Sequence, residues 1–414
     1  MIDGSWLKHK KTFDVLNPFD NSKILEVYDA EESGTLEAIR SSANAFKKWK
    51  KTSAEERSNY LKKFHLLVLK NKKNIAKIIT RECGKPLRES IGEVEYGASF
   101  IEWSANQCLR NCGKIFESSE KTKKMFYIKE PVGVVAAITP WNFPLAMVTR
   151  KVSAALAAGC CVVLKPSELT PITALALGEL SVEAKFPRGI FNIVNGKPKV
   201  IGDILSNNPT VKKITFTGST KVGKLLMKNS SKTIKNISLE LGGNAPFIVF
   251  SDANIDLAIE GLINAKFRNA GQTCISANRI FLNKEIHEDF LIKLKKRLKK
   301  MRIGSGLKDC DIGPLISKQA LEKVENHIQD ALDKGAKIEF GGKLHKPNSL
   351  LFEPTILTSV KQNMLVFKNE NFSPIVPILI FENDKEVVEI ANNTEYGLAS
   401  YFFTTNPRRI WSLV

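Results

Sequence analysis

The stretch that decides the fold is "VGVVAAITPWNFPLAMVTRKVSAALAAGCCVVLKPSE", residues 132–168. Short apolar runs at 132–140 and 161–165 flank an alanine-rich segment at 146–159 that has the length and pattern of a helix. Both runs are nearly continuous in Val, Ala and Ile, as strands covered on both faces of a parallel sheet require. The stretch therefore predicts a strand, a helix and a second, parallel strand.

The same alternation continues towards the C-terminus. A helical pattern at 173–186 is followed by strand patterns at 189–196, 211–219 and 235–243, with a helix at 221–229 before the last of them. A second α/β unit begins after Gly243, with strand patterns at 245–250, 278–283, 351–357 and 376–383 and helices at about 253–268 and 285–301. We expect an α/β fold of two doubly wound, Rossmann-type domains.

Two other regions complete the expected organisation. Residues from about 35 to 105 have a helical pattern, which includes a capping box from Ser53 to Glu56. Residues 113–133 contain two extended segments around "SSEKTKK", which predict a protruding hairpin suited to oligomerisation. The expected division is 1–112 with 134–242, the hairpin 113–133, and 243–414.

The composition of the chain argues against several classes of protein. The chain has 414 residues and 43% hydrophobic residues, no apolar run of the ~18 residues that a membrane span needs, and an N-terminus without a signal-peptide core. We expect a cytoplasmic protein with no membrane partner. The seven cysteines lack metal-ligand spacing, which predicts no metal site and no disulfide framework. The net charge of +19 is spread along the chain, as in the lysine-rich helix at 285–301, so we expect no nucleic-acid partner.

Unusual residues stand where the first set of strands ends. Asn142 follows the first strand, Lys165 and Glu168 the second, Ser219 a later one, and Glu240 the last. Carboxyl ends of parallel strands meet at one edge of the sheet, where such folds bind ligands. Each residue alone also fits a structural role: the turn from Gly218 is a good N-cap, and its G-x-x-x-x-G spacing to Gly223 is not the dinucleotide fingerprint.

Cys274 indicates that these residues belong to one functional site. It lies among small and polar residues in "FRNAGQTCISANR", residues 267–279, as an accessible thiol requires. Together with "ECGKPLRES", "PWNFP", "KPSELTP", "FTGSTKVG", "LELGGNAPFIV" and "NTEYGLA", this stretch resembles the aldehyde dehydrogenase superfamily along the whole chain. Within it, "VTRKVSAALAAG" and "KFRNAGQTC" look most like succinate-semialdehyde dehydrogenases.

The resemblance implies a covalent mechanism. Cys274 corresponds to the nucleophile that attacks the aldehyde carbon, and the Asn142 amide with the Cys274 backbone N–H to the groups that receive the oxyanion. Glu240 corresponds to the general base for hydrolysis of the thioester. The alternative for Glu240 is a solvated loop carboxylate.

The resemblance also implies a NAD or NADP cofactor, held by an NAD(P)-binding domain formed from 1–112 and 134–242, with 243–414 as the catalytic domain. A carboxylate at Glu168 would repel a 2′-phosphate and favours NAD. Ser373 and Asn369 depart from the family pattern, which usually has glycine at the first position and often glutamate at the second. The residues expected to bind the cofactor are Trp141, Lys165, Ser167, Glu168, Gly218, Ser219, Gly223, Glu370 and Phe372.

Arg150 and Arg268 match the arginines that hold the substrate carboxylate in succinate-semialdehyde enzymes of γ-aminobutyrate catabolism, and a structural ion pair is the alternative for either. Glutaric semialdehyde is an open alternative substrate, since one methylene discriminates by only ~1–3 kcal/mol. Ser276 replaces the second cysteine of some relatives, so we expect no local disulfide switch.

Relatives continue beyond "RRIWSLV" with a tunnel-lining loop and an interface strand. The expectation is therefore either an active homodimer or homotetramer, or a truncated remnant that binds nucleotide without turnover.

Overall fold

The computed structural model describes all residues, 1–414, and divides them into two compact units. Unit 1 comprises Met1–Leu16, Lys23–Cys83 and Ser90–Leu241, and unit 2 comprises Asn17–Ser22, Gly84–Glu89 and Gly242–Val414. The prediction had placed 17–22 and 84–89 with the first region and had set the hairpin apart from it. The short segments join unit 2 because Gly84 packs on prolines of that unit: an added Cβ would lie 2.6 Å from Pro314 and 3.0 Å from Pro18. The roles assigned to the domains stay predictions.

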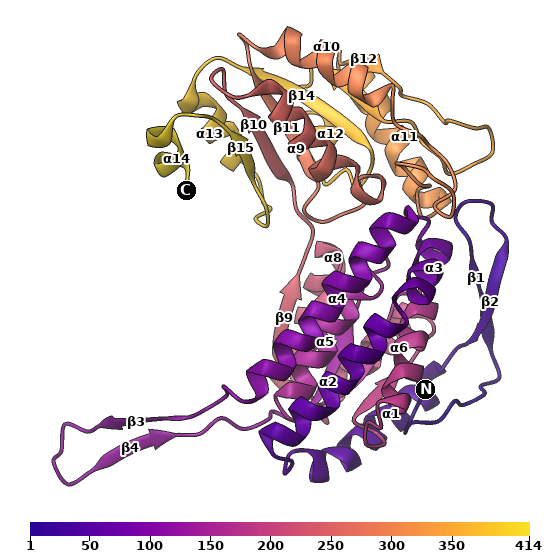
Figure 1. Cartoon of the computed structure of the whole chain (residues 1–414), viewed down its shortest axis with the longest axis vertical. Helices are drawn as coiled ribbons and strands as arrows, with labels where there is room; N and C mark the ends of the chain where they lie inside the picture. The colour runs from indigo at the N-terminus through magenta and orange to yellow at the C-terminus, as the bar shows by residue number, and fades with distance from the viewer. The chain divides into compact units, whose positions relative to one another are not determined.

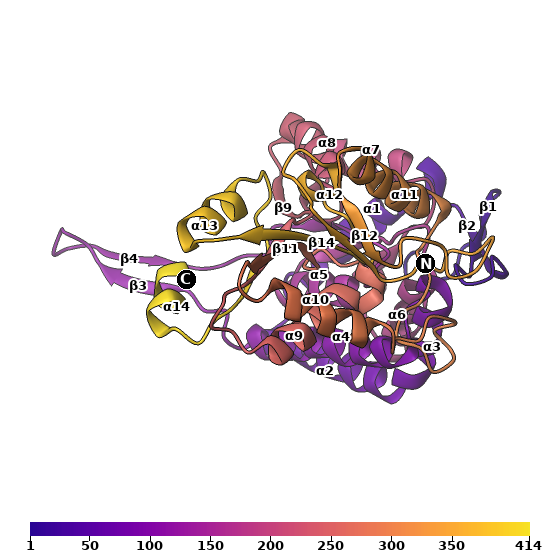
Figure 2. The same ribbon diagram turned by 90° about the horizontal axis from the view of Figure 1, so that it is seen from above.

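Unit 1 is built around a five-stranded parallel sheet in the order β7-β6-β5-β8-β9. Helices α1, α7 and α8 pack on one another and on this sheet, whereas α5 and α6 contact it from the other side, with α2 and α3 packed against them. Figure 1 looks onto α2, α3 and α4, and Figure 2 shows α1, α7 and α8 on the side of the unit opposite to α2 and α3. Its strands are β1 (Thr12–Leu16), β2 (Lys23–Tyr28), β3 (Lys114–Glu117), β4 (Lys124–Tyr127), β5 (Val134–Ile138), β6 (Cys161–Lys165), β7 (Phe191–Ile193), β8 (Val211–Thr217) and β9 (Asn236–Glu240). Its helices are α1 (Glu31–Trp49), α2 (Ala54–Lys70), α3 (Lys72–Cys83), α4 (Leu87–Cys108, whose first turn belongs to unit 2), α5 (Ala146–Ala157), α6 (Ile172–Glu183), α7 (Pro198–Asn207) and α8 (Thr220–Ser230).

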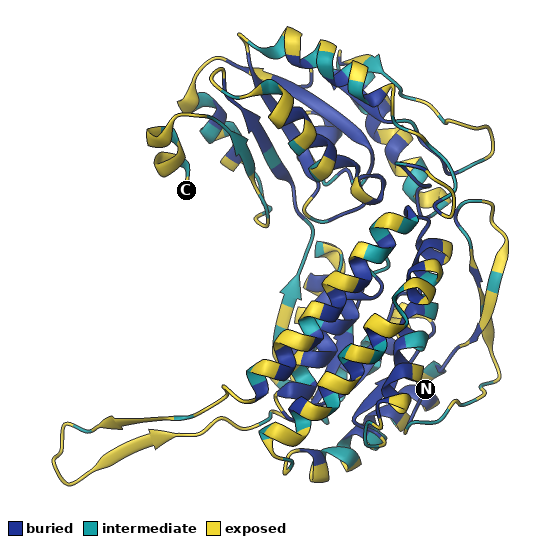
Figure 3. Ribbon diagram, viewed as in Figure 1, coloured by how far each residue is buried: buried dark blue, intermediate teal, exposed yellow.

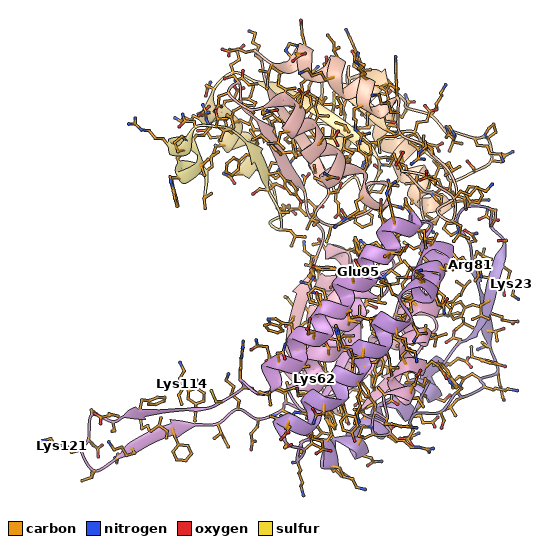
Figure 4. All side chains as sticks on the ribbon, in the orientation of Figure 1. Lys23, Lys62, Arg81, Glu95, Lys114 and Lys121 are labelled. Atoms are coloured by element: carbon orange, nitrogen blue, oxygen red, sulfur yellow. The ribbon has the colours of Figure 1, made fainter.

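The predicted hairpin is present. Strands β3 and β4 pair antiparallel from Lys114↔Tyr127 to Glu117↔Lys124, and both views show them extending away from the helices of unit 1 (Figures 1 and 2). Every residue of the two strands is exposed, as Figure 3 shows, and Lys114 and Lys121 mark the hairpin in Figure 4. A two-stranded hairpin with no covered face is marginally stable on its own.

Unit 2 contains a six-stranded sheet in the order β12-β13-β14-β11-β10-β15, in which only the β12 pairing is antiparallel. Its core combines apolar side chains from these strands with those of α9, α10 and α11. Its elements are β10 (Ala245–Val249), α9 (Ile255–Phe267), β11 (Ala277–Asn283), α10 (His287–Leu298), α11 (Lys318–Asp333), β12 (Lys337–Phe340), β13 (Thr355–Thr358), α12 (Leu365–Lys368), β14 (Ile375–Phe381), α13 (Asp384–Asn392), β15 (Tyr401–Phe403) and α14 (Pro407–Leu413).

The structure confirms the predicted α/β class and its parallel sheets. Ser53 accepts the backbone N–H of Glu56 as predicted, and Phe290, Leu294 and Leu298 form the buried face of the lysine-rich helix. Helix α7, between the strands predicted at 189–196 and 211–219, was not predicted, and neither were α11, β12, α13 and β15 of unit 2. No helix is both long and apolar enough to cross a bilayer, and no group of three or more His, Cys, Asp or Glu side chains is arranged to hold a metal ion.

Candidate active site

The carboxyl edge of the unit 1 sheet collects most of the predicted residues of that unit. The chain runs outward from β5 to β6 and β7, then crosses to β8 and β9 on the other side. Ligands of doubly wound sheets bind at this kind of reversal, outside the strand ends. The residues placed there are Trp141 and Asn142 after β5, Lys165, Ser167 and Glu168 at the end of β6, Gly218 and Ser219 after β8, and Glu240 at the end of β9.

Asn142 lies in a short, buried loop between β5 and α5, with 4% of its surface exposed. The Cys83 thiol donates to the Asn142 carbonyl over 3.8 Å. Immediately after the loop, the buried carboxylate of Glu93 accepts the backbone N–H groups of Leu145 and Ala146 at 2.9 and 3.2 Å. A carboxylate at this position satisfies the first amides of α5 and complements its dipole. The loop is therefore held at Asn142 itself and where it enters α5.

A second buried carboxylate holds the next loop of the same edge. Glu82 accepts the N–H groups of Ile172 and Thr173, at the start of α6, at 2.8 and 3.0 Å. Complete burial raises the pKa of Glu82 to about 8, against the lowering effect of its Thr173 and Ile172 donors. Thr170 joins the two loops, because its hydroxyl donates to the Trp141 carbonyl at 3.3 Å.

Lys165 is buried at the end of β6, where its Nζ donates to Glu168 Oε2 at 3.0 Å and to the Pro166 carbonyl at 2.9 Å. Burial lowers the pKa of Lys165, and Glu168 opposes that shift. The Ser167 hydroxyl is used within the loop, where it accepts the N–H of Leu169 at 3.2 Å. An ammonium and a carboxylate side by side offer a donor and an acceptor to the hydroxyls of a ribose.

The start of α8 offers groups that fit a pyrophosphate. Ser219 is its N-cap and accepts the N–H of Val222, and the Gly218 N–H donates to the Glu240 carbonyl at 3.0 Å. The remaining first-turn N–H groups and the positive end of the helix dipole favour an anion. A Cβ on Gly223 would lie 2.6 Å from Leu241, so this glycine allows α8 to approach the sheet. The residues present fit a dinucleotide.

Arg150 and Glu240 are brought together although they are far apart in the chain. Arg150 Nη1, from α5, lies 3.3 Å from both carboxylate oxygens of Glu240, and the Thr217 hydroxyl donates to Glu240 Oε2 at 3.2 Å. The Arg150 guanidinium also lies 4.9 Å from the centre of the Phe100 ring, on α4. The neighbouring Lys151 donates to Thr215, and burial lowers its pKa to about 8, opposed by Glu240.

Cys274 belongs to unit 2 and follows a left-handed turn. Asn269, Ala270 and Gly271 have φ values of 52°, 56° and 76°, a conformation that costs non-glycine residues about 1–2 kcal/mol each. Hydrogen bonds hold the turn: Glu89 accepts the Asn269 N–H at 2.7 Å, and the Gln272 side chain donates to the Asn269 carbonyl at 2.9 Å. Cys274 comes three residues before β11 and is partly exposed, in contrast to the buried Cys160 and Cys161.

Glu370 is also in unit 2, where its Oε1 accepts the Gly243 N–H at 3.1 Å. Burial raises the pKa of Glu370, an effect that Gly243 opposes. Phe372 has φ 54°, and the fully buried Ser373 has a hydroxyl with no hydrogen-bond partner. Arg268, at the end of α9, is exposed. Cys274, Arg268, Glu370 and Phe372 are thus in unit 2, and the other predicted site residues are in unit 1.

Sequence reasoning missed the polar residues that support the predicted ones. Glu82 and Glu93 are acidic residues at buried positions of α3 and α4, and Lys151 and Lys266 are buried lysines on α5 and α9. Helical spacing places each on the apolar face of its helix, which is the signal that could have identified them. Phe100 offers no such signal, because nothing in the sequence indicates that its ring meets Arg150.

Comparisons with known proteins agree with one family. The model of the "Aldehyde dehydrogenase family" matches residues 6–414. The chain is 45% identical to the mitochondrial succinate-semialdehyde dehydrogenase of Rattus norvegicus over 99% of this chain and 79% of the rat enzyme. It is 45% identical to the NADP(+) succinate-semialdehyde dehydrogenase of Escherichia coli and to the glutarate-semialdehyde dehydrogenase of Pseudomonas aeruginosa, in each case over 99% of this chain and 86% of the relative.

Solved structures give the same result. A crystal structure of an NADP-dependent enzyme of E. coli superposes with a TM-score of 0.99 and 45% identity, covering 100% of this chain and 86% of the other. Betaine aldehyde dehydrogenase from Staphylococcus aureus, in complex with NAD+, superposes with a TM-score of 0.97 and 33% identity, covering 100% and 83%. Both confirm the predicted fold.

Proposed function

The chain belongs to the aldehyde dehydrogenase family, and we propose that it oxidises a semialdehyde that carries a free carboxylate, succinic semialdehyde above all, to the dicarboxylate. Relatives that act on succinic and glutaric semialdehydes support semialdehyde oxidation in general. The observation that carries the finer assignment is Arg150, whose guanidinium lies beside the carboxylate of Glu240 at the strand edge. A fixed guanidinium is the group best suited to recognise a carboxylate.

We assign the nucleophile to Cys274. Its sulfur attacks the aldehyde carbon, and the carbonyl oxygen becomes an oxyanion that the Asn142 amide and the Cys274 N–H receive. The buried loop of Asn142, held by Cys83 and Glu93, supports this role, since an oxyanion donor must be fixed before the charge develops. The partial exposure of Cys274 supports the access that an aldehyde needs.

We assign the hydrolytic step to Glu240. Its carboxylate takes a proton from a water molecule, whose oxygen bonds to the thioester carbon; the carbon–sulfur bond breaks and the thiolate leaves. Thr217 and Arg150 hold the carboxylate at the end of β9. This ordered position supports a general base rather than a solvated loop residue.

The cofactor assignment rests on the strand edge of unit 1. Lys165 and Glu168 would hold the adenosine ribose, Ser219 and the N–H groups of α8 the pyrophosphate, and Glu370 the nicotinamide ribose. When bound, a nicotinamide accepts the hydride from the substrate. Glu168 favours NAD through repulsion of a 2′-phosphate, although its contact with Lys165 reduces that repulsion. We propose NAD as the preferred cofactor, while the E. coli relative is named for NADP(+).

We further propose that two or more copies assemble through the exposed hairpin, and that the enzyme acts in the cytoplasm. The apolar side chains on the hairpin support the first point, with Ile115 81% and Phe126 71% exposed. Fractionation of the source cells tests the compartment, and a mitochondrial location, as in the names of several relatives, would contradict it.

Steady-state oxidation of matched aldehydes tests the substrate assignment. Succinic semialdehyde, glutaric semialdehyde and butanal differ in carboxylate and chain length, and reduced cofactor is followed by absorbance. We expect the carboxylate to raise kcat/KM, and Arg268→Ala to raise KM for succinic semialdehyde far more than KM for butanal. Equal effects of Arg268→Ala on both substrates would contradict the assignment, and a preference for glutaric semialdehyde would shift it by one methylene.

A further inference from the structure

The side chain of Arg150 has two neighbours that compete for its position. On one side its guanidinium lies 4.9 Å from the centre of the Phe100 ring. On the other its Nη1 lies 3.3 Å from both oxygens of Glu240, a distance at the long end for a charge-assisted hydrogen bond. The two charged side chains are 36% and 26% exposed, so the ion pair is partly hydrated. A pair of this geometry is weak enough to exchange partners.

Arg150 also lines two cavities of unit 1. The first, of about 500 Å³, has Glu240, Lys151, Lys213 and Thr215 among its lining residues. The second, of about 740 Å³, is lined by residues of α4 that include Phe100 and Trp103. The guanidinium therefore has space on the Phe100 side to which it can turn, while Lys151 remains near Glu240 in the first cavity.

We propose that the Arg150–Glu240 ion pair is a substrate-operated switch: the carboxylate of the substrate draws the guanidinium away from Glu240 and thereby frees the general base for hydrolysis. This inference rests on the proposed function and goes beyond it, because it couples recognition of one end of the substrate to a bond-breaking step at the other. An aldehyde without a carboxylate leaves Arg150 on Glu240, so its thioester is hydrolysed more slowly. The enzyme then distinguishes aldehydes with a carboxylate from those without one by the rate of thioester hydrolysis as well as by binding.

The chemical step itself is unchanged. Water gives a proton to Glu240, its oxygen bonds to the acyl carbon, and the acyl–sulfur bond breaks with its electron pair on Cys274. While Arg150 faces both carboxylate oxygens and Thr217 donates to one of them, a water must compete with these donors for the proton acceptor. Because a partly exposed ion pair contributes little, its removal should change the hydrolysis rate by up to about fivefold.

Hydrolysis of a preformed acyl-enzyme tests the switch without any cofactor. p-Nitrophenyl acetate acetylates Cys274, gel filtration removes the ester, and mass spectrometry of the peptide that contains Cys274 follows loss of the acetyl group. The acetyl group has no carboxylate, so propionate can be added separately to occupy Arg150. Sodium chloride at equal ionic strength controls for screening.

We expect propionate to accelerate deacetylation of the wild type about two- to fivefold over chloride. Arg150→Met should deacetylate faster than the wild type without propionate and should not respond to it. Thr217→Val is the matched control: it removes a neutral donor from the same carboxylate, keeps the guanidinium, and should retain the response to propionate.

Two results would overturn the switch. One is an equal effect of propionate and chloride on the wild type; the other is an Arg150→Met variant that responds to propionate as the wild type does. Neither result removes aldehyde oxidation itself, which does not require the switch, but the second also withdraws Arg150 as the ligand of the substrate carboxylate in the proposed function. If the ester labels other thiols and not Cys274, the nucleophile assignment fails, and this inference fails with it.

Discussion

Replacement of Lys266 by methionine should stabilise the protein, in a manner that depends on pH. Lys266 lies in the last turn of α9, is 0% exposed, and its Nζ has no hydrogen-bond partner. Burial lowers its pKa to about 7, an effect opposed by the charge of Glu370. A buried ammonium without a partner costs free energy, which the folded state avoids in part by release of the proton. Methionine has a similar length and no charge, so it can fill the same space.

The magnitude follows from proton linkage. The drop from 10.5 to about 7 corresponds, at ~1.4 kcal/mol per pKa unit, to a cost of about 5 kcal/mol below pH 7. The unfolded chain holds its proton up to about pH 10.5 and the folded chain loses it near 7, so wild-type stability rises with pH between these values. The advantage of Lys266→Met should therefore shrink from nearly 5 kcal/mol at about pH 6 to about 2 kcal/mol at about pH 9.

Equilibrium unfolding in urea, followed by far-UV circular dichroism at several pH values, measures this difference. Lys300→Met, at an exposed lysine of unit 2, is the control and should show no comparable pH-dependent gain. A Lys266→Met variant that is less stable than the wild type, or a gain that stays constant from pH 6 to 9, would refute the reasoning. The first result would mean that the amine makes a favourable contact, and the second that its charge does not change on unfolding.

Three further substitutions test other parts of the structure. Asn142→Ala should lower kcat for aldehyde oxidation by about 10²–10³ with little change in KM, as steady-state kinetics will measure. His327 is buried with its pKa lowered to about 4, so the wild type should lose up to about 3 kcal/mol of stability as pH falls from 6.5 to 4; His327→Gln should flatten this loss in thermal unfolding at each pH. Phe126→Asp on the hairpin should shift the protein to smaller species in analytical ultracentrifugation, and an unchanged assembly would exclude the hairpin as the interface.

The order of β5, α5 and β6 could be predicted because each element has a recognisable pattern in its own stretch of sequence. Strands β5 and β6 are uninterrupted apolar runs, and α5 between them has a helical pattern of fitting length. The hairpin could be predicted from two extended segments that flank a polar turn, "SSEKTKK". Helix α7 was missed because its sequence, "PKVIGDILSN", is short and contains a glycine and a proline that suggest a loop.

Some features of the candidate site could also be predicted from the local sequence, and others could not. Residues such as Ser219, which caps α8, do what their local sequence indicates. The left-handed turn before Cys274 could not be predicted, because the Asn269 N–H donates to the carboxylate of Glu89, which lies far away in the sequence. Ser373 departs from the family pattern, and its buried, unpartnered hydroxyl gives that departure a physical cost that the sequence alone does not reveal.

The contact between Arg150 and Glu240 could not be predicted from the sequence. Each residue was assigned a role separately, Arg150 for the substrate and Glu240 for water, with a structural ion pair as the alternative for Arg150. Strand order brings the two side chains together, because β8 alone separates β9 from β5, and α5 follows β5 in the chain. The ion pair exists, and its long distances and partial exposure make it too weak to serve stability alone. In the switch that we propose, the same arginine is an ion-pair partner in the free enzyme and a substrate ligand in the complex, so the two alternatives would be successive states of one side chain.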